Sequence, residues 1–329
     1  MQKTLEDFAK TMDTRTALFD VKIDSEMDET LILSGRLLDR SQLVDLHRLF
    51  PDRKLDTASI RILNLETHAH VHVATNLTGL YERPTFGMPL SSELYYGTNL
   101  EGLDENSNWA FTRQGDGYLG WVNRRYLSAG NAPLPTHIVI SPAIELRDEP
   151  DEGSGVITRL VSGTGVGLEE SRGNWSFVHA NKTGWVPLSS LRSLADIPES
   201  ISDKRTLMVK DAKRMIGVPY LWGGTSGNGI DCSGFVRLLH RWVGVDILRD
   251  ADMQHIAAYP VQPPFEVGDL FFFGEGGGPR NITHVGMSLG GWTMIHSSRG
   301  RNGVYVDDVQ ESPFLKDIFV SGGSFLRSE

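Results

Sequence analysis

Near the start of the chain, apolar and polar residues alternate in two stretches, ALFDVKIDS from Ala17 and TLILSGRLL from Thr30. This alternation is typical of strands with one buried face. The segment SQLVDLHRLF instead has the spacing of a short helix with Ser41 as its N-cap, and ASIRILN from Ala58 returns to the strand pattern. With the acidic stretch 24–29 as the first turn, these elements predict a small α+β unit, to which we assign only a packing or spacer role.

An internal repeat follows, in which short strand patterns are broken by Gly, Pro, Asn and Asp over residues 66–195. Trp109 lies 66 residues before Trp175, and Trp121 lies 64 residues before Trp185. Each copy ends in Gly-Trp-Val and has the strand and turn pattern of a small β-barrel. Large aromatic residues at matching positions predict that these tryptophans fill the two barrel cores.

The two copies differ at places that a shared scaffold does not explain. The first copy has Glu93 where the second has no acidic residue, and it has Tyr118 where the second has Lys182. Equivalent positions of a repeat need equivalent core residues. We therefore interpret Glu93 and Tyr118 as candidate binding residues.

In the carboxy-terminal part, the segment VPYLWGGTSGNGI is rich in Gly, and a helical apolar pattern then begins at Asp231 and ends at Gly244. Cys232 is thus predicted in the first turn of a helix, with Asp231 and Ser233 as capping groups. A helix amino terminus favours the thiolate form of a cysteine through its unpaired N–H groups and the macrodipole. This position is typical of a nucleophile rather than of a packing thiol.

Two histidines are expected near this thiol. His284 opens HVGMSLGG, His296 closes WTMIHS, and Gly290 and Gly291 join the two alternating segments as a hairpin. Both imidazoles are predicted near the same end of the hairpin. One imidazole can then take the thiol proton while the second orients the first, as in a Cys-His-His relay.

Composition narrows the possible functions. Among 329 residues there is one cysteine, which excludes an intramolecular disulfide framework and a Cys-rich zinc module. The formal net charge of −10 argues against a general affinity for nucleic acid or for anionic membranes. We find neither 18 consecutive apolar residues nor the apolar core of a secretory signal, so we expect a cytoplasmic protein without nucleic-acid or membrane partners.

Together these patterns predict four domains. A polar, Pro-containing segment around Pro198 marks the last boundary. The predicted ranges are 1–65 for the amino-terminal unit, 66–132 and 133–195 for the two barrels, and 196–329 for an α+β domain that contains the cysteine.

Five ordered blocks around the cysteine resemble the NlpC/P60 cysteine peptidases: GVPYLWGGTSGNGIDCSGFV, LRDADMQ, VGDLFFF, HVGMSLG and MIHSS. The two repeats resemble bacterial SH3-like (SH3b) domains, which are often attached to cell-wall enzymes. The first resemblance implies a papain-like α+β fold with Cys232 as nucleophile, His284 as base and His296 as the third, orienting residue. We expect neither a cofactor nor a metal.

Two SH3b domains ahead of an NlpC/P60 domain look like the endopeptidases that cleave the γ-D-glutamyl to L-diamino acid bond of murein peptides with a free amino-terminal L-alanine. The expected partners are murein tripeptides and tetrapeptides that have already been released from the wall. In such enzymes the first SH3b domain helps to close off the amino end of the substrate, so Glu93 and Tyr118 are expected to bind its ammonium. Further substrate contacts are expected from Tyr220, Trp222, Asp231, Ser233, Asp250 and Ala251.

One position departs from the family pattern. Ala251 stands where many members have a serine or threonine, and Ile247-Leu248-Arg249 stands where members often have Leu-Pro-Arg. The missing hydroxyl removes one side-chain contact to the substrate, and it leaves the cysteine and the two histidines unchanged.

Three alternatives remain open from the sequence. They are a non-catalytic peptidoglycan-binding protein, an amidase or acyltransferase that uses the same thiolate, and a zinc site formed by Cys232, His284 and His296. The segment GEGGGP before Arg280 lacks the Lys-Ser/Thr of a P-loop, so we interpret it as a flexible lip of the cleft rather than as a phosphate site.

Overall fold

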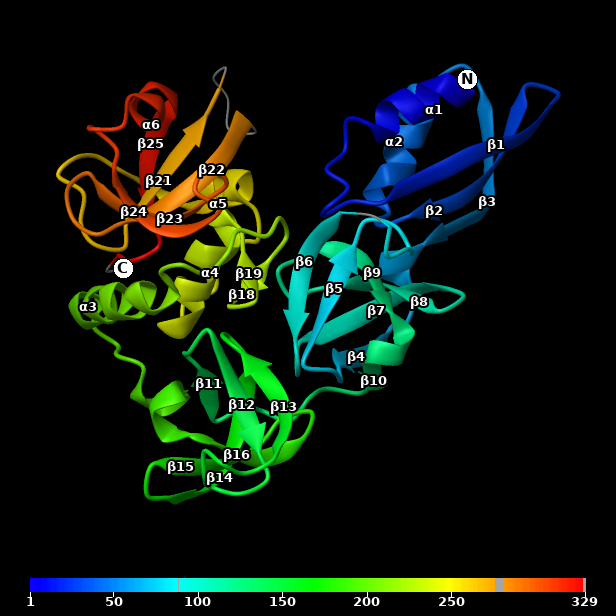
Figure 1. Ribbon diagram of the computed structural model, residues 1–329. Coiled ribbons are helices and arrows are strands. Elements are labelled where there is room, and N and C mark those ends of the chain that lie inside the picture. The colour runs from blue at the N-terminus through cyan, green and yellow to red at the C-terminus, as the bar shows by residue number, and fades with distance from the viewer. Residues whose placement is uncertain (88, 276–280, 328–329) are drawn as a thin grey trace.

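The amino-terminal unit is a three-stranded sheet packed against two helices. A computed structural model of the protein describes residues 1–87, 89–275 and 281–327 (Figure 1). The strand order is β1-β2-β3, with β1 antiparallel and β3 parallel to β2. The elements of this unit are α1 (Gln2–Ala9), β1 (Phe19–Met27), β2 (Thr30–Leu37), α2 (Ser41–Leu49) and β3 (Lys54–Ile62).

The three expected strands and the expected helix of this unit are confirmed, whereas α1 was not predicted. Two details were wrong. Strand β1 continues through Met27, so the turn consists of Asp28 and Glu29, whose φ angles of 47° and 65° suit a tight hairpin. Helix α2 has Arg40, not Ser41, at its N-cap position. The Asp39 side chain accepts the Ser41 N–H at 2.9 Å, so Asp39 provides the side-chain hydrogen bond at the helix start that was expected from Ser41.

Two seven-stranded antiparallel sheets follow, and their strands occur in the same spatial order, β10-β4-β7-β8-β9-β5-β6 and β17-β11-β14-β15-β16-β12-β13. The shared strand order shows that the two copies of the sequence repeat have the same sheet topology. The first sheet contains β4 (Ala69–Val73), β5 (Leu77–Tyr81), β6 (Leu90–Tyr95), β7 (Asn99–Asn106), β8 (Trp109–Arg113), β9 (Leu119–Asn123) and β10 (Leu127–Ala129). The second contains β11 (His137–Val139), β12 (Ala143–Arg147), β13 (Val156–Val161), β14 (Gly165–Arg172), β15 (Trp175–His179), β16 (Thr183–Pro187) and β17 (Leu191–Ser193).

The tryptophans of the repeat do not form the barrel cores as predicted. The equivalent residues Val122 and Val186 belong to the aliphatic clusters of the two sheets. Side chains alternate along a strand, so the neighbouring Trp121 faces the other way. With Trp109 it packs instead against residues of the amino-terminal unit, in a cluster that includes Leu38 and Leu63. These tryptophans therefore fix the amino-terminal unit to the first barrel.

The carboxy-terminal domain combines a six-stranded sheet, in the order β20-β25-β21-β22-β23-β24, with the helix that begins at the cysteine. Its main core joins that helix to the sheet through Phe235, Trp242, Val285 and Ile295. The helices are α3 (Ile201–Ala212), α4 (Cys232–Trp242), α5 (Ala251–Ala257) and α6 (Pro313–Ile318). The strands are β18 (Thr225–Ser226), β19 (Gly229–Ile230), β20 (Tyr259–Val261), β21 (Leu270–Gly274), β22 (Ile282–Ser288), β23 (Thr293–Ser298), β24 (Gly303–Asp308) and β25 (Phe319–Ser324).

Short 3-10 helices connect several of these elements. They are Leu63–Leu65, Arg124–Tyr126, Leu188–Ser190, Leu194–Asp196 and Lys213–Met215. Within the described residues, no helix has both the length and the apolar character needed to cross a membrane.

Candidate active site

Cys232 is the first residue of α4, as the sequence predicted, and its side chain is buried. Asp231 is the N-cap, and its carboxylate accepts the Gly234 N–H at 2.7 Å. The thiol lies beside β22, where the backbone at Val285 forms a hydrogen bond with it, and the backbone at Ser233 forms another. The cysteine is thus fixed between the start of a helix and the central strand of the sheet.

The surroundings of the thiol have opposing effects on its pKa. Burial raises the pKa of Cys232 to about 12, and the nearby Asp231 carboxylate raises it further, while the two backbone hydrogen bonds oppose this. Desolvation therefore opposes the stabilisation of a thiolate that is expected from the helix terminus. A neighbouring base must remove the proton during attack.

His284, the candidate base, is the first of three residues joined by hydrogen bonds. Nε2 of His284, on β22, lies 2.6 Å from Nδ1 of His296 on β23, and Nε2 of His296 lies 2.9 Å from Oδ2 of Asp307 on β24. The hairpin that sequence analysis proposed for the two histidines is confirmed by the pairing of β22 with β23. Asp307 was not predicted as a site residue.

The carboxylate of Asp307 determines which ring nitrogens carry protons. A carboxylate only accepts hydrogen bonds, so His296 carries its proton on Nε2 and accepts at Nδ1. His284 then donates from Nε2, and its Nδ1 is left as the basic nitrogen. Burial, together with the neighbouring His296, lowers the pKa of His284 to about 3, so this imidazole rests in its neutral form with Nδ1 unprotonated.

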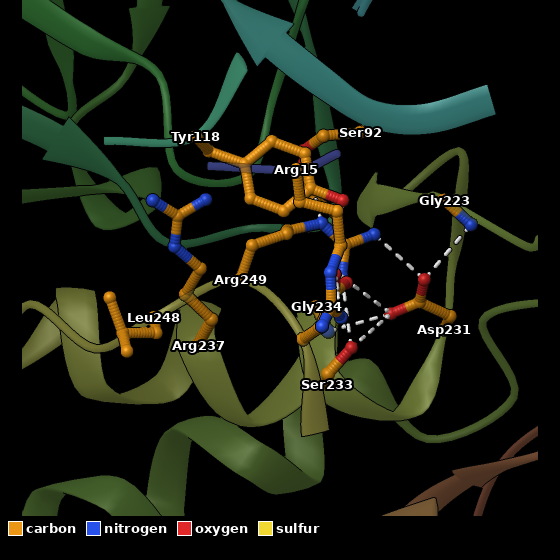
Figure 2. A network of polar contacts seen from close by, with 12 residues as sticks. Arg15, Ser92, Tyr118, Gly223, Asp231, Ser233, Gly234, Arg237, Leu248 and Arg249 are labelled. Carbon is orange, nitrogen blue, oxygen red and sulfur yellow. Dashed lines mark hydrogen bonds and ion pairs between the residues drawn. The ribbon is translucent and has the colours of Figure 1, made fainter. Parts of the chain in front are cut away.

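A buried arginine, Arg249, connects the start of α4 to the first barrel and the glycine-rich loop (Figure 2). Nη2 of Arg249 lies 2.7 Å from Oδ2 of Asp231, and its Nη1 also donates to the Ser233 hydroxyl at 2.9 Å. Nε of Arg249 donates to the Ser92 hydroxyl of the first barrel at 3.0 Å. Asp231 in turn accepts the Gly223 N–H, so the arginine and the aspartate together fix the glycine-rich loop against the barrel.

A cavity of about 1020 Å³ opens over the cysteine. Residues of the amino-terminal unit, the first barrel and the carboxy-terminal domain all line it. Trp222 is 62% exposed at its wall, and burial raises the pKa of the Tyr220 phenol there. The cavity brings together these residues expected from the sequence: Tyr118, Tyr220, Trp222, Asp231, Cys232, Ser233, Asp250, Ala251, His284 and His296.

Glu93 is the expected binding residue that does not line this cavity. It is buried on β6, where its Oε2 accepts the Thr225 N–H at 2.8 Å. Burial raises the pKa of Glu93, and the hydrogen bonds from Thr225 and Ser226 partly oppose that shift. Its carboxylate therefore joins the first barrel to the loop before α4, which is a structural role.

A different carboxylate of the first barrel reaches the cavity. Glu82 lines it together with Asp252 of α5 and with Arg15 from the amino-terminal unit, and sequence analysis singled out none of the three. Glu82 has no hydrogen-bond or ion-pair partner among the described residues. Comparison of the repeats passes over Glu82, because the second copy also has an acidic residue, Asp148, at the equivalent position.

Two further expectations concern the surroundings of the site. Within the described ranges, no group of three or more His, Cys, Asp or Glu side chains is arranged to hold a metal ion. Nε2 of His284 and Nδ1 of His296 are hydrogen-bonded to each other, and Nε2 of His296 is hydrogen-bonded to Asp307. Of the stretch 274–279, interpreted from the sequence as a lip of the cleft, residues 276–279 lie outside the described residues.

Comparison with known proteins identifies related chains. The gamma-D-glutamyl-L-lysine dipeptidyl-peptidase of Bacillus cereus is 27% identical over 251 residues, which cover 69% of this chain and 73% of that protein. Dipeptidyl-peptidase 6 of Lysinibacillus sphaericus is 27% identical over 257 residues, which cover 73% of this chain and 91% of that protein.

A solved structure supports the same relationship at the level of the fold. The crystal structure of an NlpC/P60 family protein from Bacillus cereus matches with a TM-score of 0.66, covering 78% of this chain and 100% of that chain at 22% sequence identity. Residues 217–322, which include the cysteine and both histidines, match the NlpC/P60 family. The carboxy-terminal domain of this chain is therefore similar to the NlpC/P60 family over residues 217–322.

Proposed function

We propose that this chain is a cysteine peptidase that hydrolyses the bond between γ-D-glutamate and an L-diamino acid in murein peptides with a free amino-terminal L-alanine. The names of the two relatives, gamma-D-glutamyl-L-lysine dipeptidyl-peptidase and dipeptidyl-peptidase 6, support this reaction. The observation that carries the proposal is the series from His284 through His296 to Asp307, in one cavity with the Cys232 thiol.

The chemistry begins when His284 takes the thiol proton and the sulfur of Cys232 attacks the γ-carbonyl carbon of D-glutamate. Protonated His284, stabilised through His296 by Asp307, gives that proton to the leaving amine of the diamino acid. Water, with His284 again as the base, then hydrolyses the thioester and releases L-alanyl-D-glutamate with a free γ-carboxylate. We assign stabilisation of the oxyanion to the Cys232 N–H at the start of α4 and to the Tyr220 phenol.

The barrel side of the cavity suits a positively charged amino end. Glu82 offers a carboxylate that is unpaired among the described residues, and an ammonium is its natural counter-ion. The Tyr118 hydroxyl donates to Oδ2 of Asp250 at 3.0 Å, which leaves its lone pairs available to accept from an ammonium. Glu82 thus replaces Glu93 in the proposed contact, and the exposed Trp222 ring supplies an apolar wall for the alanine methyl group.

Free and N-acetylated L-Ala-γ-D-Glu-L-Lys test this assignment in a matched pair. The wild type is expected to cleave the free peptide at least about tenfold better in kcat/KM, the value of one lost charged hydrogen bond. Glu82→Gln is expected to lose this preference. Glu93→Gln is expected to keep it, because that side chain contacts the Thr225 N–H and not the cavity.

Two results would contradict the proposal. Equal turnover of both peptides by the wild type excludes the requirement for a free amine. A preference that survives Glu82→Gln and disappears in Glu93→Gln excludes Glu82 as the ammonium partner.

A further inference from the structure

One cation of the cavity wall comes from the amino-terminal unit, to which the sequence assigned no role in binding. Arg15 lies between α1 and β1, and it lines the cavity together with Thr14. Its guanidinium has five N–H donors, and all five are used at 2.7–2.8 Å. The acceptors are the carboxylates of Asp13, Asp250 and Asp252.

These three carboxylates gather around one charge. Asp250 is the residue before α5 and Asp252 lies in its first turn, so both belong to the carboxy-terminal domain. The hydrogen bonds that Arg15 donates to Asp252 and Asp13 raise the pKa of its guanidinium above the usual value. Without Arg15, like charges would face one another, and the nearest remaining cation to Asp250 is Arg249, whose Nη1 lies 3.8 Å from Oδ1.

The contacts of Arg15 extend to the proposed amine site. Oδ2 of Asp250 accepts from Nη1 of Arg15 and also from the Tyr118 hydroxyl, at 2.8 and 3.0 Å. The Arg15 carbonyl accepts the Leu119 N–H at 2.7 Å, next to Tyr118 in the chain. In Figure 2, Arg15 and Tyr118 lie beside Arg249, which binds the N-cap of the catalytic helix.

We propose that Arg15 is a positioning residue that fixes Asp250 and Tyr118 at the amino-binding end of the cavity, so that the amino-terminal unit sets the selection for a free amine. Because all five donors of Arg15 are occupied, it acts through these two side chains and not by binding the substrate itself. The proposal rests on the proposed function. It gives the first 65 residues a part in specificity that a spacer does not have.

Arg15→Gln tests this role, with Arg36→Gln as the matched control. Arg36 also belongs to the amino-terminal unit and also bridges to the first barrel, since its Nη1 donates to Asp104 at 2.8 Å, but it does not line the cavity. For Arg15→Gln we expect the KM of free L-Ala-γ-D-Glu-L-Lys to rise about tenfold with kcat within threefold. The preference for the free over the N-acetylated peptide is expected to fall about tenfold, and Arg36→Gln is expected to stay within twofold of the wild type.

Arg15→Lys provides a second variant that retains the charge. Lysine has three donors on a single nitrogen and cannot bind three carboxylates in the same planar arrangement, so its preference is expected between those of wild type and Arg15→Gln. An unchanged preference in the folded Arg15→Gln protein, or an unchanged preference in Arg15→Lys if the first variant does not fold, overturns the proposal. So does an equal loss on both peptides. A wild type that cleaves neither peptide rejects the proposed function instead.

Discussion

At the scale of single residues, the site depends on proton positions that one carboxylate determines. Asp307 accepts from Nε2 of His296, so Nδ1 of His296 accepts from Nε2 of His284, and Nδ1 of His284 stays unprotonated. Arg301 lies on the other side of the carboxylate, with its Nη2 2.6 Å from Oδ1. Asp307 is thus held between a cation and the imidazole that it orients.

Asp307→Asn is expected to lower kcat about 100-fold with little change in KM, because the amide can donate to His296 and reverse its tautomer. Steady-state kinetics on the free tripeptide measure the effect. Asp308→Asn is the control, since Asp308 accepts backbone N–H groups of its own turn and not an imidazole. A kcat for Asp307→Asn within threefold of the wild type would show that the tautomer does not depend on this carboxylate.

Sequence analysis proposed the cysteine and both histidines as site residues because each lies in a recognisable local pattern. The cysteine lies at a predicted helix start, and the histidines lie on a predicted two-strand hairpin. Asp307 follows Tyr305 by two residues, and Tyr305 pairs with His296 across β23 and β24, so strand alternation could have placed Asp307 on the face of His296. Comparison of the repeats indicated Glu93 as a binding residue, yet this side chain does not line the cavity. A difference between repeats marks any contact that one copy makes with its surroundings, and the contact here is with a loop of the same protein.

At the scale of elements, helix α4 contains both Cys232 and a second buried polar side chain. His240 lies on this helix, where its Nδ1 is 2.7 Å from the Val236 carbonyl oxygen and its Nε2 has no partner within the described chain. Burial lowers the pKa of His240 to about 4. The helix therefore contains an imidazole that stays neutral in the folded protein while it is protonated in the unfolded chain below pH 6.5.

This difference makes the folded state less stable in acid. Because the unfolded state binds the extra proton, the free energy of unfolding falls as pH drops from about 6.5 towards 4. Between pH 7 and pH 5, His240 alone is expected to account for about 2 kcal/mol of that fall. Urea unfolding at both pH values measures it, and His240→Gln should show a correspondingly smaller loss. Equal losses in the two proteins would contradict the buried, neutral state of His240.

The element patterns predicted most strands and helix α4, yet they placed the tryptophans in the barrel cores. Trp109 and Trp121 instead lie on the opposite face of the sheet, next to the amino-terminal unit. In β9, Trp121 and Val122 are neighbours that must face opposite ways, and alternation alone does not say which face is inside the barrel. The answer depends on the amino-terminal unit, which covers the tryptophan face. The amino-terminal unit, which is distant in the sequence, determines that the tryptophan face is buried against it, and the alternation in β9 contains no information about this contact.

At the scale of the whole molecule, the cavity exists because three parts of the chain meet around it. Arg15 and Asp250 are 235 residues apart in the sequence, and Tyr118 and Asp250 are 132 apart. No local pattern predicts such contacts, so sequence analysis left the amino-terminal unit without a role. Its attachment rests on the hydrophobic cluster that contains Leu38, Leu63 and the two tryptophans.

Leu63→Ala is expected to weaken this attachment. Leu63 is fully buried in the cluster, and removing its side chain should lower the free energy of unfolding by about 3 kcal/mol. Urea titration followed by tryptophan fluorescence measures this free energy, and Trp109 and Trp121 of the cluster are two of the seven tryptophans that contribute to the signal. The neighbouring Leu65 is largely exposed, so Leu65→Ala should change stability by less than about 0.5 kcal/mol. Similar losses in both variants would argue against an attachment through this cluster.

The most direct test of the central claim is the mass of the products formed from L-Ala-γ-D-Glu-L-Lys by the wild type and by Cys232→Ala. The wild type is predicted to yield L-alanyl-D-glutamate and free lysine, and Cys232→Ala is predicted to yield neither. Release of free alanine, an intact peptide after incubation with the wild type, or the same products from Cys232→Ala would contradict a γ-D-glutamyl peptidase that acts through this thiol.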